Sequence, residues 1–414
     1  MTASINLKAQ CGQAIIRIAA ALVLFTLLTA RVSADNVVPG HVLVRVAAGV
    51  DIRVLAADYK TTALDQLAGT TLYSLVTPRG VTETQFAARL GKDKRVLYAE
   101  PDRFIISPEV DGAPFHLAFD RTKTSATFAN SVSYTQVNLG QVDAFNQVKG
   151  KSPLATGAGI IVAVLDTGAT FTHPDLQGHY LAGYNALTPS SLPWDVADGT
   201  TNAEVGHGTM IAGLIARLAP RASIMPIRVL NGDGNGTLFD LVKGIHYANT
   251  HGARVLNMSF GCSNQSGALN DALGEAEQMG IVLVAAAGNN NIEQALAPAV
   301  GRGTLAVGAV NADNTKSPFS NFGSFVRVVA PGTDIRSTYA DGGYATWSGT
   351  SFSTPFAAAE AALILSVSPS LTAAQVTDCI RGTAHSVDSK NLLYRNKLGK
   401  GIIDIEAAVK SVHP

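Results

Sequence analysis

The feature of this sequence that most constrains its fold is a series of short apolar runs rich in Val, Ile, Leu and Ala. These runs show little alternation with polar residues, which is typical of strands that are buried on both faces of a sheet. Amphipathic segments separate them, including one that begins at His207. The pattern predicts an α/β fold with a mostly parallel sheet, in which functional side chains gather at the carboxyl ends of strands. The runs are residues 160–165, 254–258, 281–285, 304–307 and 326–329.

The bulk composition indicates a folded protein and excludes two classes of partner. With 414 residues and 47% hydrophobic content, the chain can bury one large core and a smaller accessory domain. Its 31 Lys and Arg balance 31 Asp and Glu, so it lacks the excess positive charge by which proteins hold nucleic acid or anionic membrane surfaces. The function must therefore be sought in particular sites.

Residues 1–34 have the pattern of a signal peptide. Lys8 and Arg17 precede an apolar run over 18–30, and residues 32–34 form a small-x-small cleavage site. A membrane anchor is the alternative, but the uninterrupted apolar stretch is short for a span of about 20 residues. We expect secretion, extracellular or periplasmic, with no membrane contact after cleavage. Of the cysteines, Cys262 and Cys379 remain, and we expect free, mostly buried thiols, although their spacing does not decide whether they pair.

The chain before residue 134 divides into two further segments. Residues 35–107 suggest a small α+β domain, with strands over 41–46 and 95–98 and a helix that begins near Thr82, where Gln85 can complete a capping box. Residues 108–133 are polar and without periodicity, which predicts a linker that contains the maturation cleavage. Residues 134–414 then form the main domain.

Asp166 stands at the carboxyl end of the first buried run, in the string Asp166-Thr167-Gly168. Taken alone, such an aspartate is more simply a turn residue. The string also resembles the motif of aspartic proteases, but the chain holds no second copy to form the carboxylate pair that those enzymes need.

Two other motifs place reactive side chains at the starts of predicted helices. His207 lies between Gly206 and Gly208, which permit close approach of backbone and substrate, and its ordinary pKa suits a general base. Ser351 precedes an Ala-rich helix. It can cap that helix, and it can also act as a nucleophile whose oxyanion the helix N-terminus stabilises, since the two roles are compatible.

The order Asp166, His207, Ser351 resembles that of the subtilisin-like serine proteases (subtilases, peptidase S8), over about residues 134–408. The resemblance implies a three-layer fold with a mostly parallel central sheet, and an endopeptidase that forms an acyl-enzyme. Ser351 would be the nucleophile, His207 the proton shuttle and Asp166 the group that orients the imidazole. Residues 35–107 resemble the inhibitor I9-like propeptide of the family, which implies a self-processing zymogen. The expected partners are protein or peptide substrates and the propeptide, and the expected state is a monomer.

The same resemblance assigns supporting residues. Asn289 would donate its side-chain amide to the oxyanion together with the backbone N–H of Ser351, although Asn289 also suits an ordinary turn. The residues that would line the substrate are Ser259, Phe260, Gly261 and Gly288. The first three would pair their backbone with an extended peptide and form one wall of the pocket for the side chain before the scissile bond. The alternative for these three is an ordinary buried strand end.

The sequence also departs from the family pattern. The helix after His207 passes through residues 219–222 without the loop that binds calcium in subtilisins, so the usual tight site is expected to be missing and no cofactor or metal ligand is assigned. Asp175 matches a calcium ligand of the family, but one carboxylate cannot build a cage of six to eight oxygens. Weaker sites near Asp195 and Asp198 are an alternative to plain acidic surface loops.

Further departures concern the pocket and the residues beside the motifs. Met210 stands where many relatives carry a second His, Phe352 and Ser353 replace Met-Ala, and residues 290–297 are short for the pocket loop. Two rival functions stay open: a catalytically silent subtilase that acts as a binding module, and a sedolisin. Sedolisins use Glu in place of His, so the intact residues 206–209 speak against the second rival.

Overall fold

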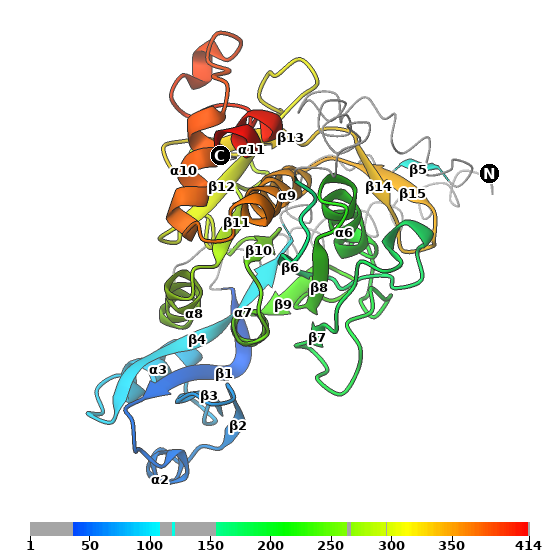
Figure 1. The fold of residues 1–414 in the computed structure, drawn as a ribbon. Helices are drawn as coiled ribbons and strands as arrows, with labels where there is room; N and C mark the ends of the chain where they lie inside the picture. Colours follow the sequence, from blue (N-terminus) through cyan, green and yellow to red (C-terminus); the bar gives the residue numbers. More distant parts are fainter. Residues whose placement is uncertain (1–35, 108–117, 121–154, 263–265, 295, 413–414) are drawn as a thin grey trace, which may run out of the picture.

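The computed structural model describes residues 36–107, 118–120, 155–262, 266–294 and 296–412. The predicted signal peptide and almost all of the predicted linker lie outside the described residues. A small domain, blue and cyan in Figure 1, extends from one side of a larger domain that carries the remaining elements.

The small domain is an antiparallel sheet of order β2-β3-β1-β4 with two helices. The capping box expected at Thr82 and Gln85 is present at the start of α3. Val42, Val44 and Phe86 are fully buried in the core between sheet and helices. The elements are β1 (Val37–Val46), α2 (Ile52–Asp58), β2 (Ala63–Gln66), β3 (Leu72–Val76), α3 (Glu83–Leu90) and β4 (Val96–Ile106).

The large domain is built on a seven-stranded sheet of order β13-β12-β11-β10-β6-β8-β7. All of its strand pairs are parallel, which confirms the predicted sheet type. The five apolar runs of the sequence correspond to β6, β10, β11, β12 and β13. The strands are β6 (Ile161–Asp166), β7 (Tyr184–Asn185), β8 (Ser223–Arg228), β10 (Val255–Met258), β11 (Val282–Ala286), β12 (Thr304–Val310) and β13 (Val328–Pro331).

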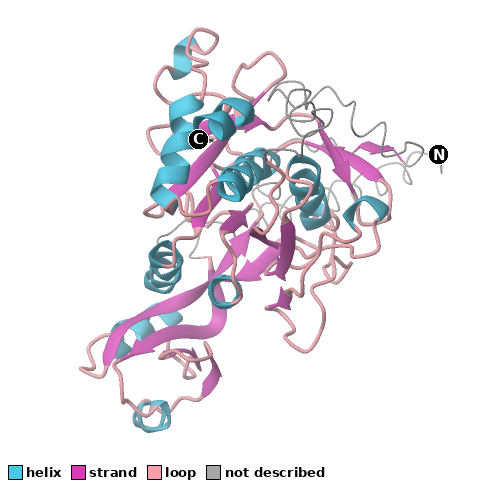
Figure 2. Cartoon of the chain, viewed as in Figure 1, coloured by secondary structure: helices cyan, strands magenta, loops and turns pink. Residues whose placement is uncertain are grey.

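Helices cover both faces of this sheet, so the domain has three layers (Figures 1 and 2). Successive residues of a strand point to opposite faces: Val164 enters the core shared with α6 and α9, and Leu165 enters the core shared with α7 and α8. The predicted three-layer α/β fold is confirmed. The helices are α6 (His207–Leu218), α7 (Leu238–Thr250), α8 (Gly267–Gln278), α9 (Thr350–Val367), α10 (Ala373–Thr383) and α11 (Ile405–Val412).

Smaller elements complete the described structure. A three-stranded sheet has the order β14-β15-β5, and two short 3-10 helices connect other elements. Within the described residues, α9 is long and apolar enough to cross a membrane, but 89% of its apolar window is buried inside the protein, as in a core helix. These elements are β5 (Ala118–Asp120), η3 (Pro174–Leu176), β9 (Asn235–Thr237), β14 (Ile335–Thr338), β15 (Tyr344–Trp347) and η4 (Leu392–Tyr394).

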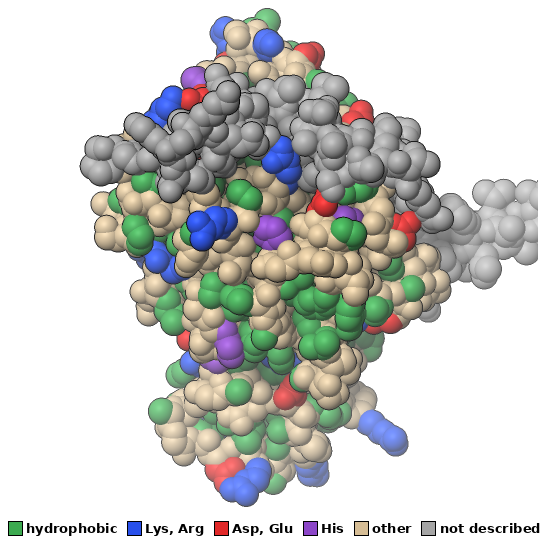
Figure 3. Space-filling model, turned by 45° about the vertical axis from the view of Figure 1, so that its right-hand side comes forward, with side chains coloured by type: hydrophobic (Ala, Val, Ile, Leu, Met, Phe, Trp, Pro, Cys, Tyr) green, Lys and Arg blue, Asp and Glu red, His purple; other side chains and the backbone are tan. Residues whose placement is uncertain are grey.

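Two surface properties follow from the same fold. Lys, Arg, Asp and Glu side chains are scattered over the face drawn in Figure 3 without a patch of one sign, in keeping with the balanced charge of the sequence. Cys262 is buried and Cys379 is half-buried, and the two are not joined to each other by a disulfide.

Candidate active site

The end of β6 and the start of α6 bring Asp166 and His207 into contact. The Nδ1 atom of His207 lies 2.7 Å from Oδ1 of Asp166, and both side chains are fully buried. Asp166 Oδ1 also accepts a hydrogen bond from the backbone N–H of Thr167 at 2.8 Å. The contact of Oδ1 with Nδ1 fixes the orientation of the imidazole ring, and the bond from Thr167 holds that oxygen in place.

The positions on either side of His207 have no room for a side chain, which explains why both are glycine. Gly206 has φ of 94°, and a Cβ there would lie 2.2 Å from the ring of Tyr339. A Cβ on Gly208 would lie 2.2 Å from the carbonyl oxygen of Gly168. The loop after β6 therefore packs directly against the first turn of α6, and only glycine permits that approach.

Asp195 holds the same turn of α6 from the other side. Its carboxylate accepts hydrogen bonds from the N–H of Gly206 at 2.9 Å, the N–H of Thr209 at 3.2 Å and the hydroxyl of Thr209 at 2.7 Å. Burial raises the pKa of Asp195, against the effect of these hydrogen bonds. The alternative of a surface acidic loop is wrong for this residue, because the side chain is buried and caps the helix that begins with His207.

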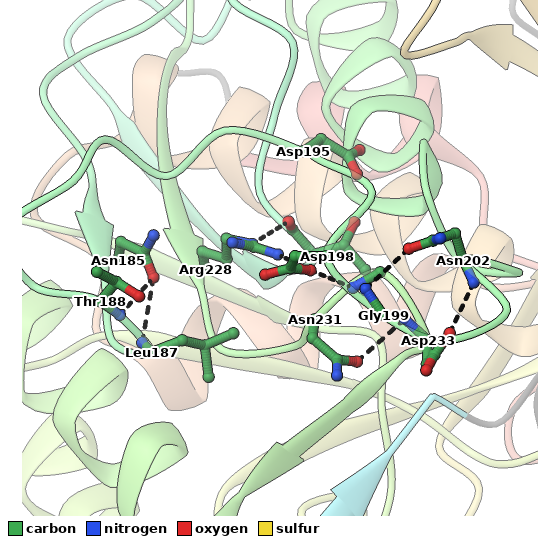
Figure 4. Close-up of polar contacts among 12 residues, drawn as sticks. Asn185, Leu187, Thr188, Asp195, Asp198, Gly199, Asn202, Arg228, Asn231 and Asp233 are labelled. Carbon is green, nitrogen blue, oxygen red and sulfur yellow. Dashed lines mark hydrogen bonds and ion pairs between the residues drawn. The ribbon is translucent and has the colours of Figure 1, made fainter.

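The other acidic residues considered as calcium ligands also bind protein groups. Asp198 Oδ1 accepts hydrogen bonds from Arg228 Nη2 at 2.6 Å and from the N–H of Gly232 at 2.9 Å (Figure 4). Asp175 Oδ2 accepts one from the hydroxyl of Tyr344 at 2.6 Å. In the part of the chain that the structure describes, no group of three or more His, Cys, Asp or Glu could hold a metal ion. Within the described residues, Asp195, Asp198 and Asp175 each accept hydrogen bonds from protein donors.

The loop in Figure 4 is fastened to the turn after β8 by Asp233. Its carboxylate accepts hydrogen bonds from three successive N–H groups of Thr200, Thr201 and Asn202, at 2.6 to 2.7 Å. These bonds lower the pKa of Asp233 to about 2. The turn that carries Asp233 also contains Gly232 and Gly234. The hydrogen bonds of Asp233 therefore join the loop before α6 to this turn.

Ser351 is the second residue of α9 and lies against the end of β10. Its Oγ donates a hydrogen bond to the carbonyl oxygen of Ser259 at 3.2 Å, and the hydroxyl of Ser259 donates to the carbonyl oxygen of Ser351 at 3.1 Å. The ring of His207 packs edge-on against Phe352, the residue after Ser351, with centroids 5.2 Å apart. The structure thus joins Asp166 and His207 directly, and it connects His207 to Ser351 through the neighbouring Phe352, while Ser351 Oγ bonds to Ser259.

Asn289 follows β11 and is tied to the residue before Ser351. Its Oδ1 accepts hydrogen bonds from the N–H of Thr350 at 2.9 Å and from the hydroxyl of Thr350 at 2.8 Å. The N–H of Gly288 donates to the same hydroxyl at 3.1 Å. The sequence predictions named Asn289 and Gly288, but not the hydroxyl of Thr350 that links both to α9.

Residues 104–107 of the small domain lie between the predicted edge at Ser259 to Gly261 and a second edge formed by Gly234 and β9. Gly261 and Ile106 exchange hydrogen bonds as an antiparallel pair, with N to O distances of 3.1 and 3.3 Å. On the other side, β4 pairs with β9, and the N–H of Ser107 donates to the carbonyl of Gly234 at 2.9 Å. The side chain of Phe260 is buried in the core, so this residue offers the groove only its backbone.

Two acidic residues of β4 dock the small domain on helix N-termini of the large one. Glu100 Oε1 accepts hydrogen bonds from the hydroxyl of Ser266 at 2.8 Å and the N–H of Ala268 at 2.9 Å, at the start of α8. Asp102 Oδ1 accepts one from the N–H of Phe239 at 3.2 Å, at the start of α7. Helix N-termini favour negative charge, yet burial raises the pKa of Asp102 to about 7.

Comparison with known proteins agrees with this geometry. A model of the Subtilase family matches residues 157–401. Subtilisin BL of Lederbergia lenta is 36% identical over 264 residues, 62% of this chain and 92% of that protein. The thermophilic serine proteinase of Bacillus sp. (strain AK1) is 37% identical over 271 residues, 63% of this chain and 64% of that protein. Fervidolysin from Fervidobacterium pennivorans shares the fold, with a TM-score of 0.71 at 24% identity, over 91% of this chain and 62% of that chain. The chain belongs to the subtilase family.

Proposed function

We propose that this subtilase is a secreted serine endopeptidase, made as a self-processing zymogen, that hydrolyses peptide bonds through an acyl-enzyme. The observation that carries the proposal is the buried hydrogen bond between Asp166 and His207 beside the helix that begins at Thr350 and Ser351. Two fully buried polar side chains would be costly to retain for packing alone. The reaction needs no cofactor, and protein or peptide chains are its substrates.

Each residue has one chemical task in the proposed mechanism. Ser351 Oγ bonds to the scissile carbonyl carbon while its proton passes to His207, and Asp166 stabilises the imidazolium that forms. His207 then gives the proton to the leaving amine as the peptide bond breaks. Water hydrolyses the acyl-enzyme by the same route and restores the serine. Asn289 and the N–H of Ser351 would hold the negative oxygen of each intermediate.

The proposed zymogen state is supported by residues 104–107. They form the middle strand between β9 and Gly261, in the groove next to Ser351, where a substrate peptide would bind. A domain that occupies this groove excludes substrate until it is removed. The cleavage that frees it would fall within residues 108–133, and secretion would follow from the signal peptide predicted in residues 1–34.

Expression of the full chain and of its Ser351→Ala variant tests both parts of the proposal. We expect the parent to shorten to a stable form and to react with a fluorophosphonate at Ser351, because that reaction needs an activated nucleophile. The variant should remain full length and unlabelled. A folded parent that takes no label would favour the silent binding module, and a purified variant that still matures would overturn self-processing.

A further inference from the structure

Glu204 lies beside the groove, and the proposed mechanism gives its side chain no role. Its side chain is fully buried. Its carbonyl accepts a hydrogen bond from the N–H of His207 at 3.0 Å, and its own N–H donates to Gly232 at 2.9 Å. The backbone of Glu204 thus connects the start of α6 to the edge of the groove, and its carboxylate faces the strand that lies there.

One partner of this carboxylate belongs to the chain segment in the groove. The hydroxyl of Ser107 donates a hydrogen bond to Oε2 of Glu204 at 3.2 Å, and Ser107 is itself fully buried. Ser107 is also held through its backbone by Gly234. The contact therefore joins a side chain of the bound segment to a side chain of the groove.

The strand register gives the position of this contact relative to the reacting bond. Ile106 stands opposite Gly261 in an antiparallel pair. In that register, a bound peptide places the residue two positions further on opposite Ser259, whose carbonyl accepts the hydrogen bond of Ser351 Oγ. The residue beside the nucleophile carries the scissile carbonyl. Ser107 thus marks the residue just before it, which we call the second-position residue.

We propose that Glu204 selects peptide substrates whose second-position residue carries a hydrogen-bond donor, namely Ser, Thr or a basic side chain. This inference rests on the proposed function and names the substrate class. A buried carboxylate is stable only when donors satisfy it, so a donor in the substrate recovers an interaction that Ala or Val would leave unmade. An acidic side chain at the same place brings two negative charges together in a dry site and is rejected.

Fluorogenic peptides that differ only at the second position test the selection on the matured enzyme. We expect kcat/KM to be about tenfold higher for Ser than for Ala and for Thr than for Val, and about a hundredfold lower for Asp than for Asn. Lys should exceed Met by at least tenfold. These ratios are taken within one preparation, so the fraction of active enzyme cancels.

Variants of Glu204 separate selection from a merely structural role. Glu204→Gln keeps an acceptor and removes the charge, so the Lys preference and the rejection of Asp should fall to within about threefold, while Ser stays ahead of Ala. Glu204→Ala should remove the Ser preference as well. Glu277→Gln makes the same charge change at a partly exposed position near the end of α8, beside Arg302, and should leave every ratio unchanged.

The outcomes distinguish this inference from the proposed function. Parent ratios within twofold of one, or preferences that persist in Glu204→Ala, overturn the role of Glu204 while peptide hydrolysis stands. Failure to cleave any peptide, together with failure of the fluorophosphonate to label Ser351, overturns the proposed function itself and this inference with it.

Discussion

The amide oxygen of Asn289 accepts both the N–H and the hydroxyl of Thr350, at 2.9 and 2.8 Å. The oxygen of this amide is turned to the start of α9, and its nitrogen is the donor end of the side chain. A substrate oxyanion formed at Ser351, the residue after Thr350, is the acceptor that we propose for this nitrogen.

This geometry predicts the effect of Asn289→Leu. We expect kcat to fall by about 10² to 10³, with KM little changed, because the amide would act on the transition state and not on bound substrate. Steady-state kinetics on one peptide measure both constants. Asn290→Leu, on the exposed neighbouring residue, is the control and should keep kcat within about threefold. Equal losses in both variants would remove Asn289 from the oxyanion site.

A second prediction concerns Asp195, the buried cap of α6. Asp195→Ala removes acceptors from Gly206 and Thr209, so we expect the free energy of unfolding to fall by about 2 kcal/mol and kcat to fall as His207 moves. Asp195→Asn should lower the free energy of unfolding and kcat by less than Asp195→Ala does, since it keeps one acceptor oxygen.

The control for this prediction is a cap far from the groove. Thr372 caps α10 and forms a capping box with Gln375. Thr372→Ala should lower stability by about 1 kcal/mol and leave kcat unchanged. Urea unfolding and kinetics well below the melting temperature measure the two effects. A destabilised Asp195→Ala enzyme with the kcat of the parent would limit Asp195 to a structural role.

The sequence predicted what depends on local pattern. The apolar runs that became β6, β10 and β11 are continuous because parallel strands are covered on both faces, and the Thr82 capping box is complete within four residues. Asp166, His207 and Ser351 could be found because each lies at the end of a strand or in the first turn of a helix.

The residues that the sequence did not reveal depend on contacts between distant segments. Ser107 meets Glu204 across 97 positions of the chain, and Asp102 meets Phe239 across 137. Asp195 lies in an irregular segment, and its sequence does not distinguish a buried carboxylate that caps a helix from an exposed one on the surface. Only the folded structure shows which of these polar side chains are buried away from solvent.

A third prediction follows from Asp102 at the junction of the two domains. Its pKa is about 7 in the docked state, against 3.8 for the ordinary carboxyl that it becomes when the small domain leaves. The docked state therefore holds the proton more tightly, so the contribution of Asp102 to docking is full below its free pKa of 3.8, weakens as the pH rises to about 7 and is constant above it. Release of the small domain should be easier in neutral than in acidic solution.

Calorimetric titration of residues 35–107 into Ser351→Ala enzyme that has been matured by added active parent, at pH 5, 6, 7 and 8, measures this dependence. Asp102→Asn cannot ionise and should flatten it. Asp58→Asn removes an exposed carboxylate that pairs with Arg95 within the small domain and should keep the parental slope. A slope that survives Asp102→Asn would assign the pH dependence to another group.

The last prediction concerns Glu360, nine residues after Ser351 on the buried helix α9. Its side chain is fully buried, and neither carboxyl oxygen has a hydrogen-bond partner among the described residues. Burial, with a smaller effect of Asp404, raises its pKa well above 4.5. The folded state therefore binds the proton more tightly than the unfolded chain, and the parent loses stability as the pH rises from about 4.5 toward the folded pKa.

Replacement of this carboxyl by an apolar group of similar length should remove that loss. On the inactive Ser351→Ala background, which prevents self-digestion, we expect Glu360→Met to raise the free energy of unfolding by about 1 to 3 kcal/mol at pH 7. The gain should be larger at pH 9 than at pH 5 in urea unfolding. Glu277→Met, at a partly exposed position beside Arg302, should stay within about 0.5 kcal/mol at every pH. If Glu360→Met instead destabilises the protein equally at pH 5 and pH 9, the carboxyl is satisfied in the core and contributes to holding α9 in place.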